Sequence, residues 1–151
     1  MKAKFVFNCT SGSRAYNLLT PLSDFDSIDV FLQPLKEKLL FPCKPIFNTS
    51  FVFDGRVHEE TYIEFTEFVR RCIAGDVKFV QVLYSDLSRM FSINYEFFKN
   101  NVNFANFIAH LKLFVDRKKF VKNLLSVSNS SLIYAGKNES YKKLAESARC
   151  L

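Results

Sequence analysis

Two short stretches, Gly12–Tyr16 (Gly-Ser-Arg-Ala-Tyr) and Ser23–Asp26 (Ser-Asp-Phe-Asp), decide the fold that we expect for this chain. The first stretch follows Lys4–Cys9, an alternating, β-rich segment that predicts an N-terminal strand. The second opens a further predicted strand, Asp26–Leu32, and the residues between them, Arg14–Leu19, fit a short helix. The order of strand, turn, helix and strand indicates a small mixed sheet that is packed on helices.

The turn Thr10–Ser13 ends in two small residues, Gly12 and Ser13. Small residues between a strand and a helix allow backbone N–H groups to approach a phosphate, and the helix N-terminus favours its negative charge. Asp24 and Asp26 are two positions apart, so on a strand both carboxylates would project from the same face. Two carboxylates held that close repel each other unless a cation lies between them, and magnesium prefers such oxygen ligands. The pattern therefore indicates a site for a metal-bound triphosphate.

The rest of the chain predicts a hairpin followed by helices. Phe51–Phe53 and Arg56–Tyr62 flank Asp54-Gly55, which is a strong hairpin signal. An apolar stripe from Phe65 to Ile73 predicts a helix that ends near Gly75. The remaining predictions are a connector of undefined form at 35–50, helices at 77–84, 92–100, 103–115 and 139–151, and a loop at 126–131. The expected fold class is α+β, with a helical C-terminal part.

Composition indicates a globular chain of 151 residues, with 48% hydrophobic and 24% charged residues. No apolar run approaches the roughly 20 residues of a membrane span, and the N-terminus does not resemble a signal peptide. The four cysteines show no Cys-x-x-Cys spacing, which favours buried thiols in a reducing cytoplasm over bridges or zinc ligands. Eighteen Phe and no Trp are typical of an AT-rich genome, such as that of a phage or a low-GC bacterium.

Charge is spread unevenly along the chain. Residues 1–76 contain 9 basic and 10 acidic residues, whereas residues 77–151 contain 12 basic and 5 acidic residues. A half with clustered acids beside a basic half suggests a metal site next to a surface for anions. The basic cluster Arg117-Lys118-Lys119 with Lys122 predicts either a surface for RNA or another polyanion, or an ordinary solvated helix end.

A family resemblance extends this interpretation. Gly12–Tyr16, Thr20–Asp26 (Thr-Pro-Leu-Ser-Asp-Phe-Asp) and Val30-Phe31 resemble the opening of nucleotidyltransferases of the DNA polymerase β superfamily. They are most similar to its bacterial and phage branch, with the signature Gly-Ser-x-x-Tyr-Gly … Thr-Pro-x-Ser-Asp-x-Asp. Tyr62–Ser85 is similar to the helix pair of that branch, and the likeness covers residues 4–90. It implies a catalytic core at 1–90 and a helical C-terminal extension at 91–151, which is shorter than the family's.

The resemblance also implies roles for individual residues. Asp24 and Asp26 are expected to be catalytic and to bind Mg²⁺ or Mn²⁺, and Gly12, Ser13 and Arg14 to hold the nucleotide. The family has a third carboxylate just before its first long helix, a position that spacing assigns to Glu59 or to its neighbour Glu60. A strand's alternation allows only one of these two on the metal face. His58 is expected either to help activate the acceptor or to be an ordinary strand histidine, and Asp29 is expected on the opposite face.

The function that the resemblance implies is transfer of an NMP from an NTP, with ATP as the expected substrate, onto an acceptor hydroxyl with release of pyrophosphate. Glu59 would complete a second metal site or act as a base. The acceptor is left open among RNA, a small molecule and a protein. The alternative is a catalytically degenerate copy of the fold that binds nucleotide or nucleic acid through its basic C-terminal half. A Glu in place of the family's more usual Asp and the shorter C-terminal part favour that alternative.

Overall fold

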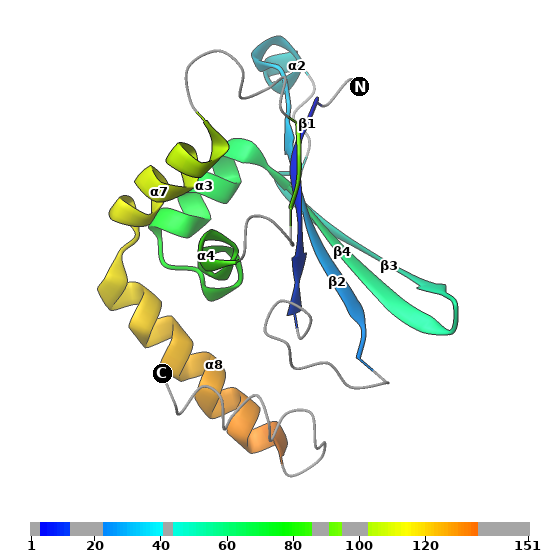
Figure 1. The fold of residues 1–151 in the computed structure, drawn as a ribbon, viewed down its shortest axis with the longest axis vertical. Coiled ribbons are helices and arrows are strands. Elements are labelled where there is room, and N and C mark those ends of the chain that lie inside the picture. Colours follow the sequence, from blue (N-terminus) through cyan, green and yellow to red (C-terminus); the bar gives the residue numbers. More distant parts are fainter. Residues whose placement is uncertain (1–3, 13–22, 41–43, 86–90, 95–102, 136–151) are drawn as a thin grey trace.

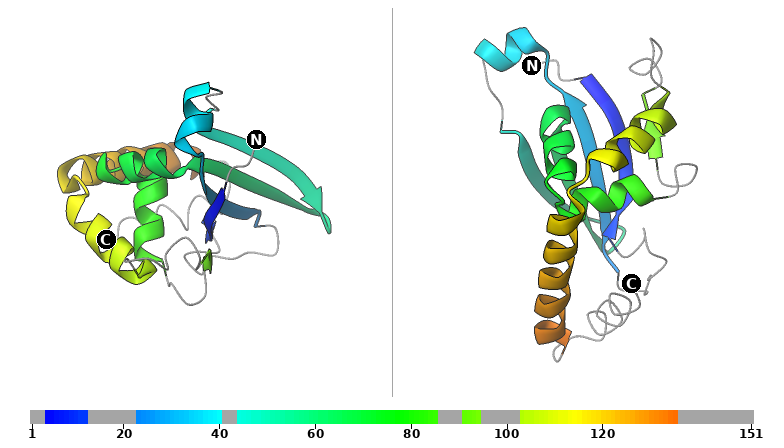
Figure 2. Two further views of the ribbon diagram at one scale, coloured as in Figure 1. Left: turned by 90° about the horizontal axis from the view of Figure 1, so that it is seen from above. Right: turned by 90° about the vertical axis from the view of Figure 1, so that its left-hand side faces the viewer.

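The computed structural model of the chain describes residues 4–12, 23–40, 44–85, 91–94 and 103–135, and it has an α+β fold. Figures 1 and 2 show a sheet with helices gathered against one of its faces. The elements in chain order are β1 (Lys4–Ser11), β2 (Phe25–Leu32), α2 (Leu35–Leu40), β3 (Ile46–Phe53), β4 (Arg56–Glu64), α3 (Phe65–Ile73), α4 (Val77–Tyr84), β5 (Phe91–Ile93), α7 (Phe104–Phe114) and α8 (Arg117–Ala135). The predicted fold class is confirmed.

The five strands form one mixed sheet in the order β3-β4-β2-β1-β5. β2 and β4 run parallel, whereas β1 pairs antiparallel with both β2 and β5, and β3 pairs antiparallel with β4. The hairpin between β3 and β4 turns at Asp54-Gly55, where both residues have positive φ, as a two-residue hairpin turn requires. The hairpin prediction is confirmed, and both of its strands are longer than predicted.

The hydrophobic core lies between the sheet and helices α3, α4 and α7 (Figure 1). Alternation along β2 directs Ile28 and Val30 into this core, and both are fully buried. Phe7 of β1 makes edge-to-face contacts with Phe68 of α3 at 5.3 Å and with Phe104 of α7 at 5.1 Å. Because these rings come from three distant parts of the sequence, their packing holds the helices against the sheet.

Side-chain caps fix where α3 and α4 begin. Glu64 is almost fully buried, and its carboxylate accepts hydrogen bonds from the N–H groups of Thr66 and Glu67 at the start of α3. Lys38 compensates this buried charge with an ion pair at 3.3 Å. Asp76 caps α4 through the N–H of Lys78 at 3.2 Å. The two helices therefore have the bounds that their apolar patterns predict, 65–73 and 77–84.

The structure corrects several sequence predictions of local structure. The connector 35–50, whose form the sequence left undefined, contains helix α2 and most of β3. Residues 92 and 93 of the predicted helix 92–100 belong instead to strand β5, which pairs with the edge of β1, and residues 95–100 lie outside the described residues. The predicted loop 126–131 lies within α8, because Ser and Asn cost only about 0.5 kcal/mol each in a helix and no Gly or Pro interrupts the segment. The turn predicted at Thr10–Ser13 begins later, since β1 extends through Ser11. The predicted helices 14–19 and 139–151 lie outside the described residues.

The division of the chain into a core at 1–90 and an extension at 91–151 stays a prediction. In the described part of the chain, β5 completes the sheet, and α7 contributes Phe104, Ile108 and Leu111 to the same core as the strands. Cys9 and Cys72 are free and buried, as predicted, and burial raises the pKa of both thiols, that of Cys9 to about 12. Among the described residues, no helix is long and apolar enough to cross a membrane.

The turn between α3 and α4 yields the first prediction. Gly75 has a φ of +72°, and a Cβ there would lie 2.6 Å from the backbone nitrogen of Phe120 in α8. We expect Gly75→Ala to reduce the free energy of unfolding by about 3 kcal/mol or more, because a left-handed conformation and a backbone clash add up. The matched control is Gly55→Ala, which has a similar φ but open space around it and should lose only about 1–2 kcal/mol. Urea unfolding measures both, and equal losses would contradict the close packing of α8.

Candidate functional site

Two carboxylates lie side by side where the parallel strands β2 and β4 meet. Asp26 of β2 is directly opposite Glu59 of β4 in the ladder. Partners in a parallel ladder project from the same face, and for this pair it is the helix-covered face that also carries Ile28 and Ile63. Asp26 also faces Ser11, the last residue of β1. The site therefore lies where the end of β1 meets the parallel pair.

Asp24 lies just before this strand rather than in it. β2 begins at Phe25, and Asp24 is exposed, whereas Asp26 is partly buried. β2 thus begins one residue before its predicted start at Asp26, and Asp24 does not share a strand face with Asp26, although the spacing of the two aspartates suggests that it does. Asp24 is nevertheless close enough to affect Asp26: burial raises the pKa of Asp26 most, and the negative charges of Glu59 and Asp24 raise it further. The two predicted aspartates and Glu59 thus interact electrostatically.

Gly12 forms one wall of the site. It has a φ of +66°, and a Cβ built on it would lie only 1.8 Å from Oδ2 of Asp26. The Asp26 carboxylate therefore packs directly against the Gly12 backbone, and any side chain at position 12 would displace it. Ser13 and Arg14, the other residues predicted to hold the nucleotide, lie outside the described residues.

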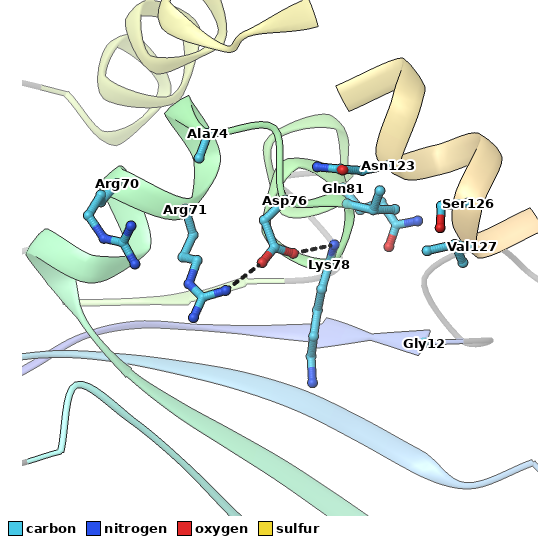
Figure 3. A pocket seen from close by; sticks show the side chains of 11 residues that line it. Gly12, Arg70, Arg71, Ala74, Asp76, Lys78, Gln81, Asn123, Ser126 and Val127 are labelled. Carbon is cyan, nitrogen blue, oxygen red and sulfur yellow. Dashed lines mark hydrogen bonds and ion pairs between the residues drawn. The ribbon is translucent and has the colours of Figure 1, made fainter. Parts of the chain in front are cut away.

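Lys78 is a site residue that the sequence analysis missed. It lies in the first turn of α4, and its Nζ donates a hydrogen bond of 2.8 Å to Oγ1 of Thr61 on β4. Its positive charge lowers the pKa of Asp26 and so opposes the two acids. Figure 3 shows the Lys78 side chain extending from α4 toward the strands. A lysine that follows a capping aspartate in an apolar helix carries no motif, so only the packing of α4 on the sheet reveals its position.

These groups surround a cavity of about 230 Å³. Its lining comes from the end of β1 and from β2, β4 and α4: Ser11, Gly12, Asp26, Ser27, Glu59, Thr61, Lys78 and Gln81. A second cavity of about 670 Å³ shares Gly12, Lys78 and Gln81 with the first, and it opens between α3, α4 and α8 (Figure 3). The two adjoining cavities offer a site with acids at one end and basic side chains at the other.

The basic end of the larger cavity is held by ion pairs. Arg71 contacts Glu67 at 2.9 Å and Asp76 at 3.1 Å, and Arg70 donates to Glu67 at 2.6 Å. These two arginines lower the pKa of Glu67 to about 2. Lys78 makes no ion pair among those found in the described residues, and it is the basic side chain that lines both cavities.

The alternatives for the third carboxylate are separated by the sheet. Glu60 projects from the opposite face to Asp26, where its Oε2 accepts a 2.6 Å hydrogen bond from the Tyr62 hydroxyl. That bond raises the pKa of Tyr62 to about 12. Glu59, not Glu60, is therefore the glutamate beside Asp26. His58 also lies on the opposite face, stacked on Phe51 at 5.1 Å, so the structure gives it no place among the acids.

Asp29 is on the opposite face as well, as the sequence predicts. Its Oδ1 accepts a 2.7 Å hydrogen bond from Asn8, and its Oδ2 accepts one of 3.2 Å from Ser27. Asp29 therefore links β1 to β2 and is separated from the acid site by the sheet.

The side chains at this site are chemically suited to bind a divalent cation. Asp26 and Glu59 supply oxygen donors, the raised pKa of Asp26 reports like charges that a cation would neutralise, and Gly12 leaves room beside them. The described residues do not, however, contain a cluster of three or more His, Cys, Asp or Glu side chains already arranged to hold a metal ion. Any cation would therefore need ligands in addition to this pair, such as the phosphate oxygens of a bound nucleotide.

Comparison with known proteins found no family model and no curated protein that matches the chain. The resemblance to nucleotidyltransferases therefore rests on the residues quoted from the sequence.

Adjacent residues 59 and 60 provide a matched test of this geometry. We expect Glu59→Gln to lower the pKa of Asp26 in the metal-free protein. Of the neighbouring charges, that of Glu59 raises this pKa most, and the substitution removes it. Glu60→Gln makes the same charge change on the other face and should leave the pKa of Asp26 where it is. NMR titration of the aspartate carboxyl carbons measures both variants. A shift of equal size in the two variants would contradict the placement of Glu59.

The raised pKa of Asp26 also makes the stability of the metal-free protein depend on pH. Because the pKa of Asp26 is raised in the folded protein, folding is favoured when Asp26 is protonated. That contribution is lost as pH rises from the unfolded-state value, about 4, through the folded-state pKa. Metal-free Glu59→Gln protein should therefore be more stable than wild type at pH 7, by roughly 2–4 °C in Tm for each kcal/mol of repulsion removed.

Proposed function

We propose that the chain is a metal-dependent nucleotidyltransferase, which moves an NMP from an NTP, preferably ATP, onto an acceptor hydroxyl. The observation that carries this proposal is the pair Asp26 and Glu59, which lie opposite each other in the ladder, with the Asp26 carboxylate against the Gly12 backbone at the end of β1. Sequence resemblance assigns these same positions to the carboxylates and the phosphate turn. The register of β2 with β4 supports the proposal because it brings together the residues that the resemblance assigns to the site.

In this proposal Asp24, Asp26 and Glu59 would hold Mg²⁺ or Mn²⁺ together with the phosphates. The bound ion would neutralise charge as it develops at the α-phosphate. The acceptor oxygen attacks the α-phosphorus, the bond from that phosphorus to the bridging oxygen breaks, and pyrophosphate leaves. Glu59 either completes the ligand set or accepts the proton of the attacking hydroxyl. Asp26 is held in a partly buried position where its charge acts with little screening.

The remaining binding residues of this proposal contact the phosphates. Gly12, with Ser13 and Arg14, would hold the β- and γ-phosphates. Lys78 supports the leaving pyrophosphate in this proposal, since it lines both cavities and lies within the electrostatic reach of Asp26. A cytoplasmic location fits the free, buried thiols of Cys9 and Cys72. The acceptor is an RNA end, a small molecule or a protein side chain.

The alternative, a degenerate module that binds nucleotide or nucleic acid, rests on a different surface. Arg117, Lys118 and Lys119 are exposed at the start of α8. A site there would bind polyanions without any need for Asp26 or Glu59. Variants on the two surfaces therefore distinguish the two functions.

Nucleotide binding gives the central test of the proposal. We expect calorimetric titration to show binding of an NTP with Mg²⁺ that EDTA abolishes. Asp26→Asn and Glu59→Gln should each weaken this binding and reduce pyrophosphate release by at least about 100-fold, because each removes charge that the cation needs. Glu60→Gln is the matched control and should retain both. Absence of binding by all four nucleotides, or binding that survives in Asp26→Asn, would overturn the proposal.

A second pair of variants separates the two surfaces. Lys78→Met should weaken NTP binding by about tenfold, since a charge-assisted contact to phosphate contributes about 1.5–3 kcal/mol. Lys118→Met makes the same charge change on exposed α8 and should leave NTP affinity unaltered. If Lys118→Met has the larger effect, the basic surface is the binding site and the alternative function is favoured.

A further inference from the structure

Strand β3 is an open edge of the sheet in the described part of the chain. It is last in the strand order and pairs only with β4. Figure 1 shows it on the outer side of the sheet, away from α3, α4 and α7. The strand is eight residues long, whereas β5 at the other edge has three. An edge of this length exposes a row of unpaired backbone N–H and C=O groups that favour pairing with another strand.

The residues of β3 lack the features by which proteins usually protect such an edge. Ile46–Phe53 reads Ile-Phe-Asn-Thr-Ser-Phe-Val-Phe and has no charged residue and no proline. Its large apolar side chains are exposed: Phe47 by 42%, Phe51 by 44%, Val52 by 71% and Phe53 by 67%. Charges and prolines are the common means of preventing edge-to-edge contact. This edge is therefore suited to a partner.

The sequence of β3 is chemically symmetric about Thr49. Phe47 and Phe51 lie two positions to either side, Asn48 and Ser50 lie next to Thr49, and Ile46 mirrors Val52. An antiparallel pair of identical strands related by a two-fold axis matches each residue with its mirror position. The mirror symmetry of β3 makes the matched residues chemically alike, so that aromatic residues meet aromatic residues and small polar residues meet small polar residues, which favours pairing with a second copy.

We propose that β3 pairs antiparallel with β3 of a second copy of this chain, centred on Thr49, to form one continuous ten-stranded sheet. Phe47 then lies opposite Phe51 of the second copy, and Asn48 lies opposite Ser50 of the second copy. No like charges meet along the strand, although the chain as a whole has a net charge of +6. The interface depends on the edge alone and not on the proposed enzymatic activity.

Backbone geometry agrees with this register. Phe53 and Arg56 flank a two-residue turn and so form a hydrogen-bonded pair. Alternate residues from Phe53 toward the start of β3 therefore bond to β4, and the other set, Ile46, Asn48, Ser50 and Val52, directs its N–H and C=O groups outward. Pairing centred on Thr49 matches members of this outward set with one another, which allows the ladder to form.

Aromatic rings on the open face continue across the proposed interface. Phe47 stacks on Tyr62 at 4.8 Å, and Phe51 stacks on His58 at 5.1 Å, so each pair already joins β3 to β4. The two-fold axis would place Phe47 next to Phe51 of the second copy, which links the two pairs into a longer row. Cross-strand aromatic pairs contribute roughly 0.2–1 kcal/mol each relative to alanine. The two-fold axis is perpendicular to the sheet, so both candidate sites would open on the same, helix-covered face.

Oligomeric state tests the proposal with a matched pair of variants. Light scattering of the eluted full chain and sedimentation should show a dimer that dissociates on dilution. Ser50→Pro removes one outward N–H without breaking a bond to β4, and should weaken the dimer by about tenfold or more. Ser50→Ala retains that N–H and should dimerise as wild type does, and circular dichroism checks that both fold. A monomeric wild type, or equal dissociation constants for the two variants, would overturn the proposal.

Cross-linking tests the register separately. In a Cys43→Ser and Cys150→Ser background, Thr49→Cys places two thiols opposite each other at a non-hydrogen-bonded pair, where the Cα atoms approach about 4.5 Å. Oxidation should give a covalent dimer. Val52 is 71% exposed, but it lies opposite Ile46 of the second copy in this register, so Val52→Cys should remain unlinked. Cross-linking of Val52→Cys instead, or of neither variant, would overturn the Thr49-centred pairing.

Discussion

The parallel pairing of β2 with β4 is the constraint on which the fold and the candidate site both depend. Its register puts Asp26 beside Glu59, and two residues further along it puts Ile28 beside buried Thr61. A slip of one residue would bring Glu60 beside Asp26, but it would also turn Ile63 out of the core. Burial of the apolar residues thus fixes the position of the acids, and the acids themselves contribute nothing favourable to that pairing.

The two faces of the same strands serve different physical purposes. On the helix-covered face, Asp26 and Glu59 remain close although their charges repel, and Lys78 offsets only part of that repulsion. On the open face, Glu60 is satisfied by Tyr62, and His58 stacks between aromatic rings. Polar groups on the open face are therefore paired with one another, as in a structural surface. Unbalanced charge is concentrated on the covered face, next to the cavities, as is common where a protein binds a charged ligand.

The sequence predicted those elements whose signals are local. The Asp54-Gly55 hairpin and helices α3 and α4 follow from turn chemistry, caps and apolar period, so they were found. The predicted start of a helix at residue 92 is wrong because residues 92 and 93 belong to β5, and only the pairing of β5 with β1, which joins distant segments, makes them a strand. Of the candidate site, Asp26 and Gly12 were identified from a motif, whereas the choice of Glu59 over Glu60 needed the register, and Lys78 needed the packing of α4.

Charge balance decides how the site should be understood. Asp24 and Glu59 both raise the pKa of Asp26, and within the described residues Lys78 is the cation that lowers it. The arginines of the adjoining cavity are already paired with Glu67 and Asp76, so they cannot neutralise these acids as well. Lys78 therefore offsets only part of the repulsion around Asp26. The remaining negative charge is what the proposed divalent cation, arriving with the phosphates of a nucleotide, would neutralise.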